Sequence, residues 1–358
     1  MQKRELIDRR SPDEIIFIQF THYLGFYTRW VAALGFILRK TLAAHKINVY
    51  NLAQVRKMVS QHLGSATYPS ATLPISADGN LHLDSKIARA FGEELSGNYC
   101  FTEPFPHIVI DNFLPLPLIE EIYSLFPTEK LSDDKFYDDD YSGLHKRQVP
   151  PESCEQKIRS IFHFFNSAPV LQFLEGLTTI DSLIGDPYFN GGGFHEIFNG
   201  GKLGVHADFR INEQLHLNRR INMLIYLNKN WDPDFGGNLE IWDRRMKLKV
   251  DSVSPLFNRC VIFNTDADSY HGHPDPLKTP NEITRKSIAL YYYTASKKIY
   301  EETPAHSTMY VARPSDSQQI KRQAAKLRRQ NYEKDWIPPI AFRTWSKLKS
   351  KIKKIITG

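Results

Sequence analysis

Residues 203–211 read LGVHADFRI, a strand-like run that carries a histidine and an aspartate two positions apart. Side chains of a β-strand alternate between its two faces, so residues i and i+2 point to the same side. His206 and Asp208 would therefore direct an imidazole and a carboxylate at one point in space. Buried polar groups need partners, and a bound cation is one partner that would suit both.

Two further histidines follow a second strand-like run. The stretch 263–277, FNTDADSYHGHPDPL, offers His271 and His273. Two histidines and one carboxylate from separate strands make the facial triad of non-haem Fe(II) oxygenases, which leaves coordination positions open for a bidentate co-substrate and O2. The pattern therefore predicts an Fe(II) site at His206, Asp208 and one of these two histidines.

A cation follows at a suitable distance along the chain. The most common co-substrate of such iron sites is 2-oxoglutarate, whose far carboxylate is held best by the planar fork of an arginine. The run TRKSIALYYYT at 284–294 supplies Arg285 at the start of a strand that is otherwise rich in Ile, Leu and Tyr. Buried, this arginine needs an anionic partner. The alternative is an arginine at the rim of the sheet.

These residues resemble a known family. The blocks HAD, RRINMLIYLN, FGGNLEIWD, FNRCVIFNTDADSYHGHPDPL and RKSIALYYYT are similar to the iron- and 2-oxoglutarate-dependent dioxygenases of the prolyl 4-hydroxylase type, above all to bacterial members, over about residues 98–300. The resemblance implies a double-stranded β-helix in which His206, Asp208 and His271 hold Fe(II). It also implies that Arg285 and Tyr226 bind 2-oxoglutarate, with ascorbate as a further cofactor.

Four other positions have more than one interpretation. Tyr226 has a packed aromatic residue as its alternative reading. The family often has a tyrosine upstream of the first ligand, where Phe198 stands in this chain. Asn222 and His195 are expected to be satisfied core residues, although both are near enough in sequence to face the pocket.

The resemblance implies hydroxylation of an unactivated C–H bond in a prolyl, other peptidyl, amino-acid or small-molecule substrate, with 2-oxoglutarate and O2 consumed. A nucleic-acid demethylase with the same iron chemistry is one alternative. It would need a basic groove near the metal, which the charge distribution does not favour. A non-catalytic jelly-roll binding module is the other, although it would be expected to have lost a metal ligand or Arg285.

The fold class follows from the strand pattern. From about residue 185 the chain shows short β-branched or aromatic runs bounded by Gly, Asn, Asp and Pro, which predict a mainly β fold with flanking helices and a jelly-roll core. We expect an N-terminal helical arm and linker over residues 1–85, the dioxygenase domain over 98–300, and a basic helical tail over 301–358.

The polar stretch 128–152 contains five aspartates and is expected to form a long exposed loop, with an active-site lid as the alternative.

Charge is concentrated at the C-terminal end. Residues 320–358 hold 12 Lys or Arg against 2 Asp or Glu, so the remaining 319 residues carry −4 of the total charge of +6. A helix over 342–358 would place Trp345, Leu348, Ile352 and Ile355 on one stripe among lysines. Such a helix either packs on the body or binds an anionic membrane surface or an acidic partner.

The N-terminal segment 15–38 is apolar but is interrupted by Arg29 and several polar residues. It predicts a packed helix, with an interfacial helix and a membrane span as alternatives. Three widely separated cysteines form no disulfide framework. The sequence therefore predicts a cytoplasmic protein, with peripheral membrane association as the variant that the basic tail allows.

Overall fold

The computed structural model describes residues 68–76, 81–295 and 306–336, with side chains described as far as residue 330. All of these belong to one compact unit that begins at Tyr68. The helix expected over 15–38 and the amphipathic helix expected over 342–358 lie outside the described residues, and both stay predictions. In the described ranges, no helix is both long and apolar enough to span a membrane.

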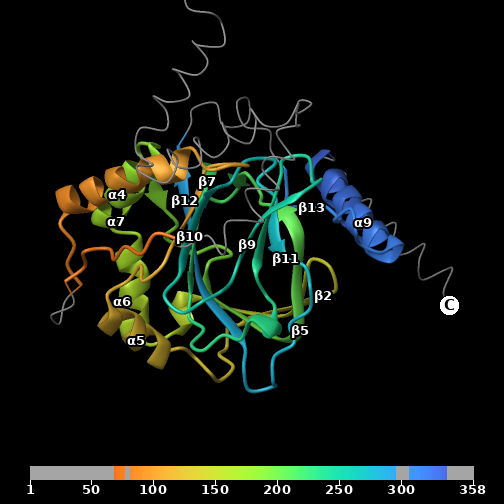
Figure 1. The fold of residues 1–358 in the computed structure, drawn as a ribbon, viewed down its shortest axis with the longest axis horizontal. Helices are drawn as coiled ribbons and strands as arrows, with labels where there is room; N and C mark the ends of the chain where they lie inside the picture. Colours follow the sequence, from red (N-terminus) through yellow and green to blue (C-terminus); the bar gives the residue numbers. More distant parts are fainter. Residues whose placement is uncertain (1–67, 77–80, 296–305, 337–358) are drawn as a thin grey trace, which may run out of the picture. The chain divides into compact units, whose positions relative to one another are not determined.

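Four of the described α-helices pack on one side of the strands, and the fifth lies on the opposite side (Figure 1). They are α4 (Ser85–Cys100), α5 (Leu116–Ser124), α6 (Gln156–Phe165) and α7 (Ala168–Thr178), with α9 (Gln318–Trp336) opposite. Helices α4 and α7 approach closely at Gly92 and Gly176, where an added Cβ would overlap the backbone of the other helix.

Thirteen strands pair antiparallel in the order β1-β10-β7-β12-β5-β11-β8-β9, with β2, β3, β4, β6 and β13 attached at the sides. Their bounds are β1 (His107–Ile110), β2 (Lys135–Asp139), β3 (Gly143–Val149), β4 (Ile184–Gly185), β5 (Gly193–Ala207), β6 (Ile211–Asn212), β7 (Leu217–Tyr226), β8 (Leu239–Trp242), β9 (Lys249–Val253), β10 (Cys260–Asn264), β11 (His271–His273), β12 (Arg285–Thr294) and β13 (Met309–Tyr310). The predicted mainly β fold with flanking helices and a jelly-roll core is confirmed.

Strand β5 connects the two sheets because its two halves pair with different strands. Its first half pairs with β12 and β3, and its second half pairs with β11 and β13. The long strand thus belongs to two sheets that fold toward each other. His206 lies in the second half, where the interior of the fold is enclosed from both sides.

Alternation along β7 and β12 separates a packed face from a functional one. Ile225 and Ile288 join the main hydrophobic core beneath the helices. Tyr226 and Ser287, which neighbour these two residues along the strands, turn to the opposite face, where Tyr226 packs in a smaller hydrophobic cluster and Ser287 lines the interior cavity. Each strand therefore presents one side chain to the main core and the adjacent one to the opposite face.

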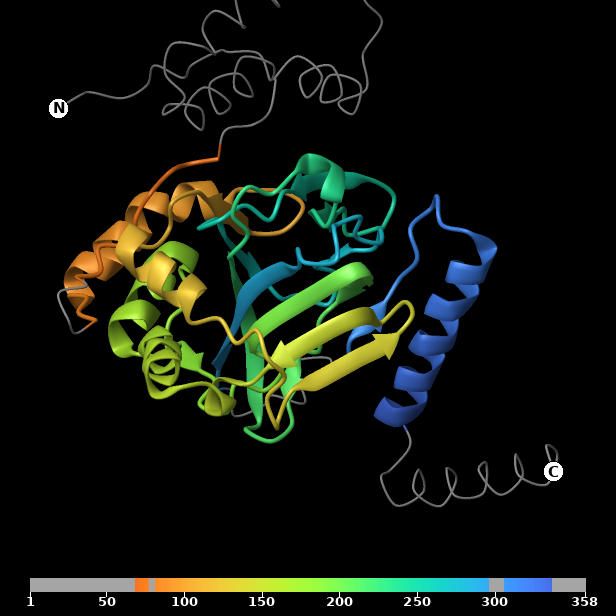
Figure 2. The ribbon, with the colours of Figure 1, turned by 90° about the horizontal axis from the view of Figure 1, so that it is seen from below.

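The prediction of an exposed loop over 128–152 is wrong for much of that stretch. Strands β2 and β3 form a hairpin whose second strand pairs with the first half of β5, alongside which it lies in Figure 2. The end of β3 is buried at Arg147, Gln148 and Val149. Backbone pairing with β5, which the polar sequence does not reveal, determines this structure.

The described residues on either side of the expected domain limits also pack with the barrel. Leu73, Ile75 and Leu83 belong to the main core, although the arm and linker were expected to reach residue 85. Beyond residue 300, β13 pairs with β5. Helix α9 lies within the basic helical tail that was expected over residues 301–358.

Candidate active site

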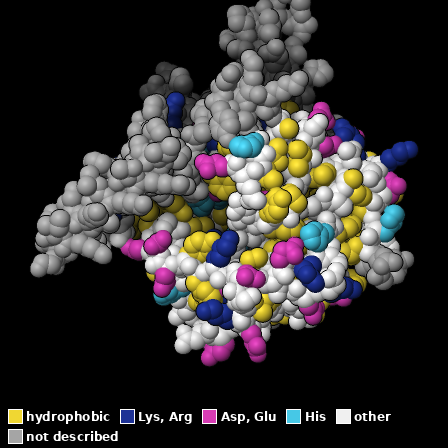
Figure 3. Space-filling model, turned by 180° about the vertical axis from the view of Figure 1, so that it is seen from behind, with side chains coloured by type: hydrophobic (Ala, Val, Ile, Leu, Met, Phe, Trp, Pro, Cys, Tyr) yellow, Lys and Arg dark blue, Asp and Glu magenta, His cyan; other side chains and the backbone are white. Residues whose placement is uncertain are grey.

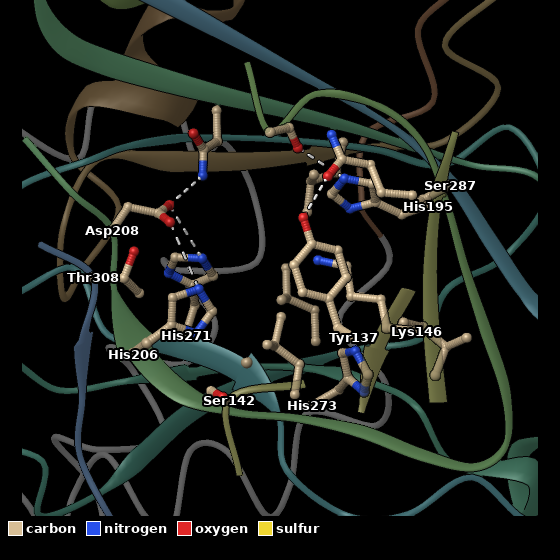
Figure 4. Close-up of a pocket in the computed structure, with 18 of the residues that line it drawn as sticks. Tyr137, Ser142, Lys146, His195, His206, Asp208, His271, His273, Ser287 and Thr308 are labelled. Atoms are coloured by element: carbon tan, nitrogen blue, oxygen red, sulfur yellow. Dashed lines mark hydrogen bonds and ion pairs between the residues drawn. The ribbon is translucent and has the colours of Figure 1, made fainter. Parts of the chain in front are cut away.

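Three of the predicted site residues meet at the end of β5. His206 on β5 is directly opposite His271 on β11, and Asp208 follows β5 by one residue. The Oδ1 and Oδ2 atoms of Asp208 each lie 3.6 Å from the Nε2 atom of one histidine. All three ligand atoms lie within 4.8 Å of one another and are buried (Figure 4).

Backbone contacts set the orientation of both imidazoles. The Nδ1 atom of His206 lies 2.8 Å from the carbonyl oxygen of Gly204, and that of His271 lies 2.9 Å from the carbonyl oxygen of Ser269. Because a carbonyl can only accept, Nδ1 carries the proton and Nε2 keeps its lone pair facing Asp208. Burial, followed by the neighbouring His271, lowers the pKa of His206 to about 4, so this ring is neutral at pH 7.

The carboxylate of Asp208 is held by two residues of β7. Its Oδ2 accepts a hydrogen bond of 2.7 Å from Asn222 and lies 3.2 Å from a guanidinium nitrogen of Arg219. Arg219 also donates to Asn222 at 2.7 and 3.0 Å and lies over the Tyr291 ring at 3.7 Å. Burial raises the pKa of Asp208, but Arg219 and then the two histidines outweigh it and hold the pKa well below its usual range.

This donor set fits Fe(II). Two neutral imidazole nitrogens and one ionised carboxylate converge from two strands on one side of a shared point, which is the arrangement of a two-histidine, one-carboxylate triad. The carboxylate is further oriented by hydrogen bonds, as metal ligands usually are. The remaining directions around that point open into a cavity of about 380 Å³.

Arg285 lines the same cavity as the triad, whereas Tyr226 is fully buried, is not one of the lining residues and contacts the guanidinium of Arg285. The guanidinium of Arg285 donates to the carbonyl oxygen of Gly237 at 2.7 Å and to the phenolic oxygen of Tyr226 at 3.2 Å. Among the described residues, no carboxylate lies within ion-pair distance of Arg285, which is only 5% exposed. Burial lowers the pKa of Arg285, which is the electrostatic sign of a cation without an anion beside it.

The cavity also contains residues that the sequence did not single out. Tyr137 and Lys146 enter from the β2–β3 hairpin, Arg219 from β7, and Thr308 and Tyr310 from β13 and the segment before it. The Tyr310 ring centre lies 5.4 Å from that of His206, directly across the β13–β5 pairing. Only strand pairing brings these sequence-distant residues to the site, so a motif search could not have found them.

The remaining sequence candidates divide into two groups. His195 and Asn222 line the cavity rather than filling the core. Phe198 is not one of the residues that line it, whereas three tyrosines are: Tyr137 from β2, Tyr291 from β12 and Tyr310 from β13. The phenolic group of Tyr137 donates to Gln148 at 2.8 Å.

His273 serves as an internal test of the metal assignment. It lines the cavity two residues from His271, and its Nδ1 atom has no hydrogen-bond partner among the described residues, yet it is not part of the three-residue cluster. We expect His273→Ala to keep metal affinity within about threefold of wild type, whereas His271→Ala should lose about 100-fold or more, since removal of a residue that only supports a metal ligand already costs about 10–100-fold. Calorimetric titration with Mn(II) compares the two; equal losses would contradict the assignment.

Comparison with known proteins gives a consistent picture. Residues 192–293 match the family described as the 2OG-Fe(II) oxygenase superfamily. "Prolyl 3-hydroxylase OGFOD1" of Mus musculus is 30% identical over 204 residues, which cover 54% of this chain and 34% of that protein. "Prolyl hydroxylase EGLN3" of Mus musculus is 32% identical over 81 residues, or 22% of this chain and 31% of that protein. The matches thus span about a third of the length of these curated relatives.

Among solved structures, a prolyl hydroxylase from Trichoplax adhaerens in complex with a hypoxia inducible factor peptide fragment is similar with a TM-score of 0.40 and 18% identity. That similarity covers 61% of this chain and 96% of the other. The resemblance to the iron- and 2-oxoglutarate-dependent dioxygenases of the prolyl 4-hydroxylase type is confirmed, and residues 192–293 carry the sequence pattern of the 2OG-Fe(II) oxygenase superfamily.

Proposed function

We propose that this chain is an Fe(II)- and 2-oxoglutarate-dependent dioxygenase that hydroxylates an unactivated C–H bond of a prolyl or other peptidyl or amino-acid substrate. The observation that carries the proposal is the convergence of His206, Asp208 and His271 in the cavity that also holds Arg285 without a carboxylate partner. A cation binding site and an anion binding site thus share one enclosed space.

The chain's residues have distinct roles in this reaction. Bound Fe(II) supplies the activation of O2; the three ligands hold it and leave positions free on the cavity side. Arg285 and Tyr226 bind and orient the far carboxylate of 2-oxoglutarate through charged hydrogen bonds. One oxygen atom of O2 enters succinate as CO2 is released, and the other enters the C–H bond of the substrate.

A peptidyl substrate is supported by the names of two curated relatives, both prolyl hydroxylases. The cavity is also lined by aromatic residues and by Arg219, whose guanidinium lies over Tyr291 and near Phe209. Flat apolar rings next to a hydrogen-bond donor suit a small aliphatic ring attached to a peptide carbonyl.

A mass-spectrometric screen tests the proposal. Purified protein with Fe(II), 2-oxoglutarate and ascorbate is incubated with libraries of proline-containing peptides, free amino acids and methylated oligonucleotides. We expect a gain of one oxygen in a peptide or amino acid that requires 2-oxoglutarate, with succinate formed in equal amount. Removal of methyl groups from the oligonucleotides instead would favour the demethylase alternative. No succinate formation with any substrate would contradict the proposed activity.

The charge pattern on the face drawn in Figure 3 supports a peptide over a nucleic acid. On the face drawn in Figure 3, the acidic and basic side chains of the described residues are interspersed rather than gathered by sign. Sequence-independent binding to nucleic acid requires a continuous basic surface. The need for ascorbate and the role of the basic C-terminal segment stay predictions.

A further inference from the structure

Two cations lie on either side of one residue of β5. Ile197 pairs directly with Lys146 on β3 and directly with Arg285 on β12. Residues that pair directly across antiparallel strands point to the same face of the sheet, and neighbouring strands are about 4.8 Å apart. The three side chains therefore form a row, and all three line the cavity.

The charge of Lys146 has no counter-ion. Among the described residues, no carboxylate lies within 4.0 Å of its Nζ atom, which instead lies 5.1 Å from the centre of the Tyr137 ring. Burial lowers the pKa of Lys146 to about 8, Asp208 opposes this shift, and Arg285 adds to it. The ammonium group thus lies in the electrostatic field of both Asp208 and Arg285, and no carboxylate in contact with it neutralises its charge.

An uncompensated buried cation is costly, and each of the other charged groups of the inner cavity has its own explanation. Arg219 is paired with Asp208, and Asp208 is a proposed metal ligand. Arg285 accounts for one carboxylate of 2-oxoglutarate under the proposed function. The co-substrate carries a second carboxylate, next to its keto group, which has no cation assigned to it in the protein.

We propose that Lys146 binds this second carboxylate, so that the two cations of the row, Arg285 and Lys146, together recognise the 2-oxoglutarate dianion. The inference rests on the proposed function and adds the β2–β3 hairpin to the co-substrate site. It also gives the cavity its preference for a dicarboxylate, because each end of the ligand meets its own positive charge.

The test measures binding rather than turnover. The Mn(II)-loaded full-length chain is titrated calorimetrically with 2-oxoglutarate and with 2-oxobutyrate, which keeps the keto acid group but lacks the far carboxylate. Lys146→Met should weaken both ligands at least about tenfold, since a hydrogen bond to a charged group contributes about 1.5–3 kcal/mol. Arg285→Gln should weaken 2-oxoglutarate alone. Lys146→Arg, which keeps the charge, should restore most of the affinity.

Lys286→Met is the matched control. Lys286 lies beside Arg285 on β12 but points to the other face, where its Nζ atom is 3.5 Å from Glu196. We expect its affinity for both ligands to be unchanged. Unchanged 2-oxoglutarate affinity in Lys146→Met, or a loss confined to 2-oxoglutarate, overturns the role of Lys146 in binding the second carboxylate while leaving the proposed function standing. Absence of 2-oxoglutarate binding to the wild-type chain overturns both.

Discussion

Replacing Asp208 with alanine should abolish Fe(II) binding and turnover. Asp208 supplies the one anionic ligand, and its two oxygens lie 3.6 Å from the Nε2 atoms of the two histidines. Without it, two neutral imidazoles remain, which form a much weaker site for a divalent cation. Loss of a hydrogen bond that supports a metal ligand lowers metal affinity about 10–100-fold. We expect loss of the ligand Asp208 itself to lower the affinity for Mn(II) by more than that. Calorimetric metal titration of the purified variant measures the loss.

A control for folding is needed because Asp208 also neutralises Arg219. That guanidinium is 2% exposed, and among the described residues its ion pair is with Asp208. Asp208→Ala therefore leaves a buried cation uncompensated, which is destabilising. The double variant Asp208→Ala/Arg219→Met removes both charges and should regain thermal stability without regaining metal. Metal affinity like that of wild type in either variant would eliminate Asp208 as a ligand.

Arg285→Gln should raise the KM for 2-oxoglutarate strongly and leave metal binding intact. Its guanidinium is buried, has no carboxylate partner among the described residues, and is fixed by Gly237 and Tyr226. Truncating one partner of a buried hydrogen-bonded charge pair typically costs about 2–5 kcal/mol, so the expected increase exceeds about 30-fold. Initial rates of succinate formation over a range of 2-oxoglutarate concentrations give the value.

Lys286→Gln is the neighbouring control, since it removes a positive charge from the opposite face of the same strand. Its KM should equal that of wild type. If Arg285→Gln itself stays within about threefold of wild type, a difference below 1 kcal/mol, then Arg285 has a structural role and not a co-substrate role.

The metal cluster was predictable from the sequence because its first two residues obey a local rule. The i, i+2 spacing of His206 and Asp208 fixes a common direction on any strand. The third member is different: the residues alone offered both His271 and His273. The structure separates them by register, since His271 pairs with His206 whereas His273 pairs with Leu203 after an irregularity in the ladder.

The sequence analysis missed Arg219 because the alternation of side chains along a strand does not predict its position. Tyr292 pairs with Ile221 and Tyr293 pairs with Arg219, so one residue of β7 is skipped. This irregularity brings Arg219 to the same side as Asn222, three residues away, against the usual alternation. Periodicity alone would have placed the arginine on the other face.

The β2–β3 hairpin was misjudged because its pattern serves the cavity rather than a core. Lys146 and Gln148 alternate with other polar residues, so no apolar period marks the strand. The sequence of a strand that lines a polar site has the same polar composition as that of a solvent-exposed loop. The pairing of β3 with β5 identifies the segment as a strand, which its composition alone does not indicate.

The pairing of β5 with four other strands also bears on how the protein is made. Its partners β11, β12 and β13 all follow it in the chain, and only β3 precedes it. While the ribosome is still adding the last third of the sequence, β5 has unsatisfied backbone groups along most of its length, and such edges favour association between chains. His206 and Asp208 are therefore synthesised well before the strands that complete and cover their site. Folding of this centre is a late, non-local event that ends only when Tyr310 has emerged.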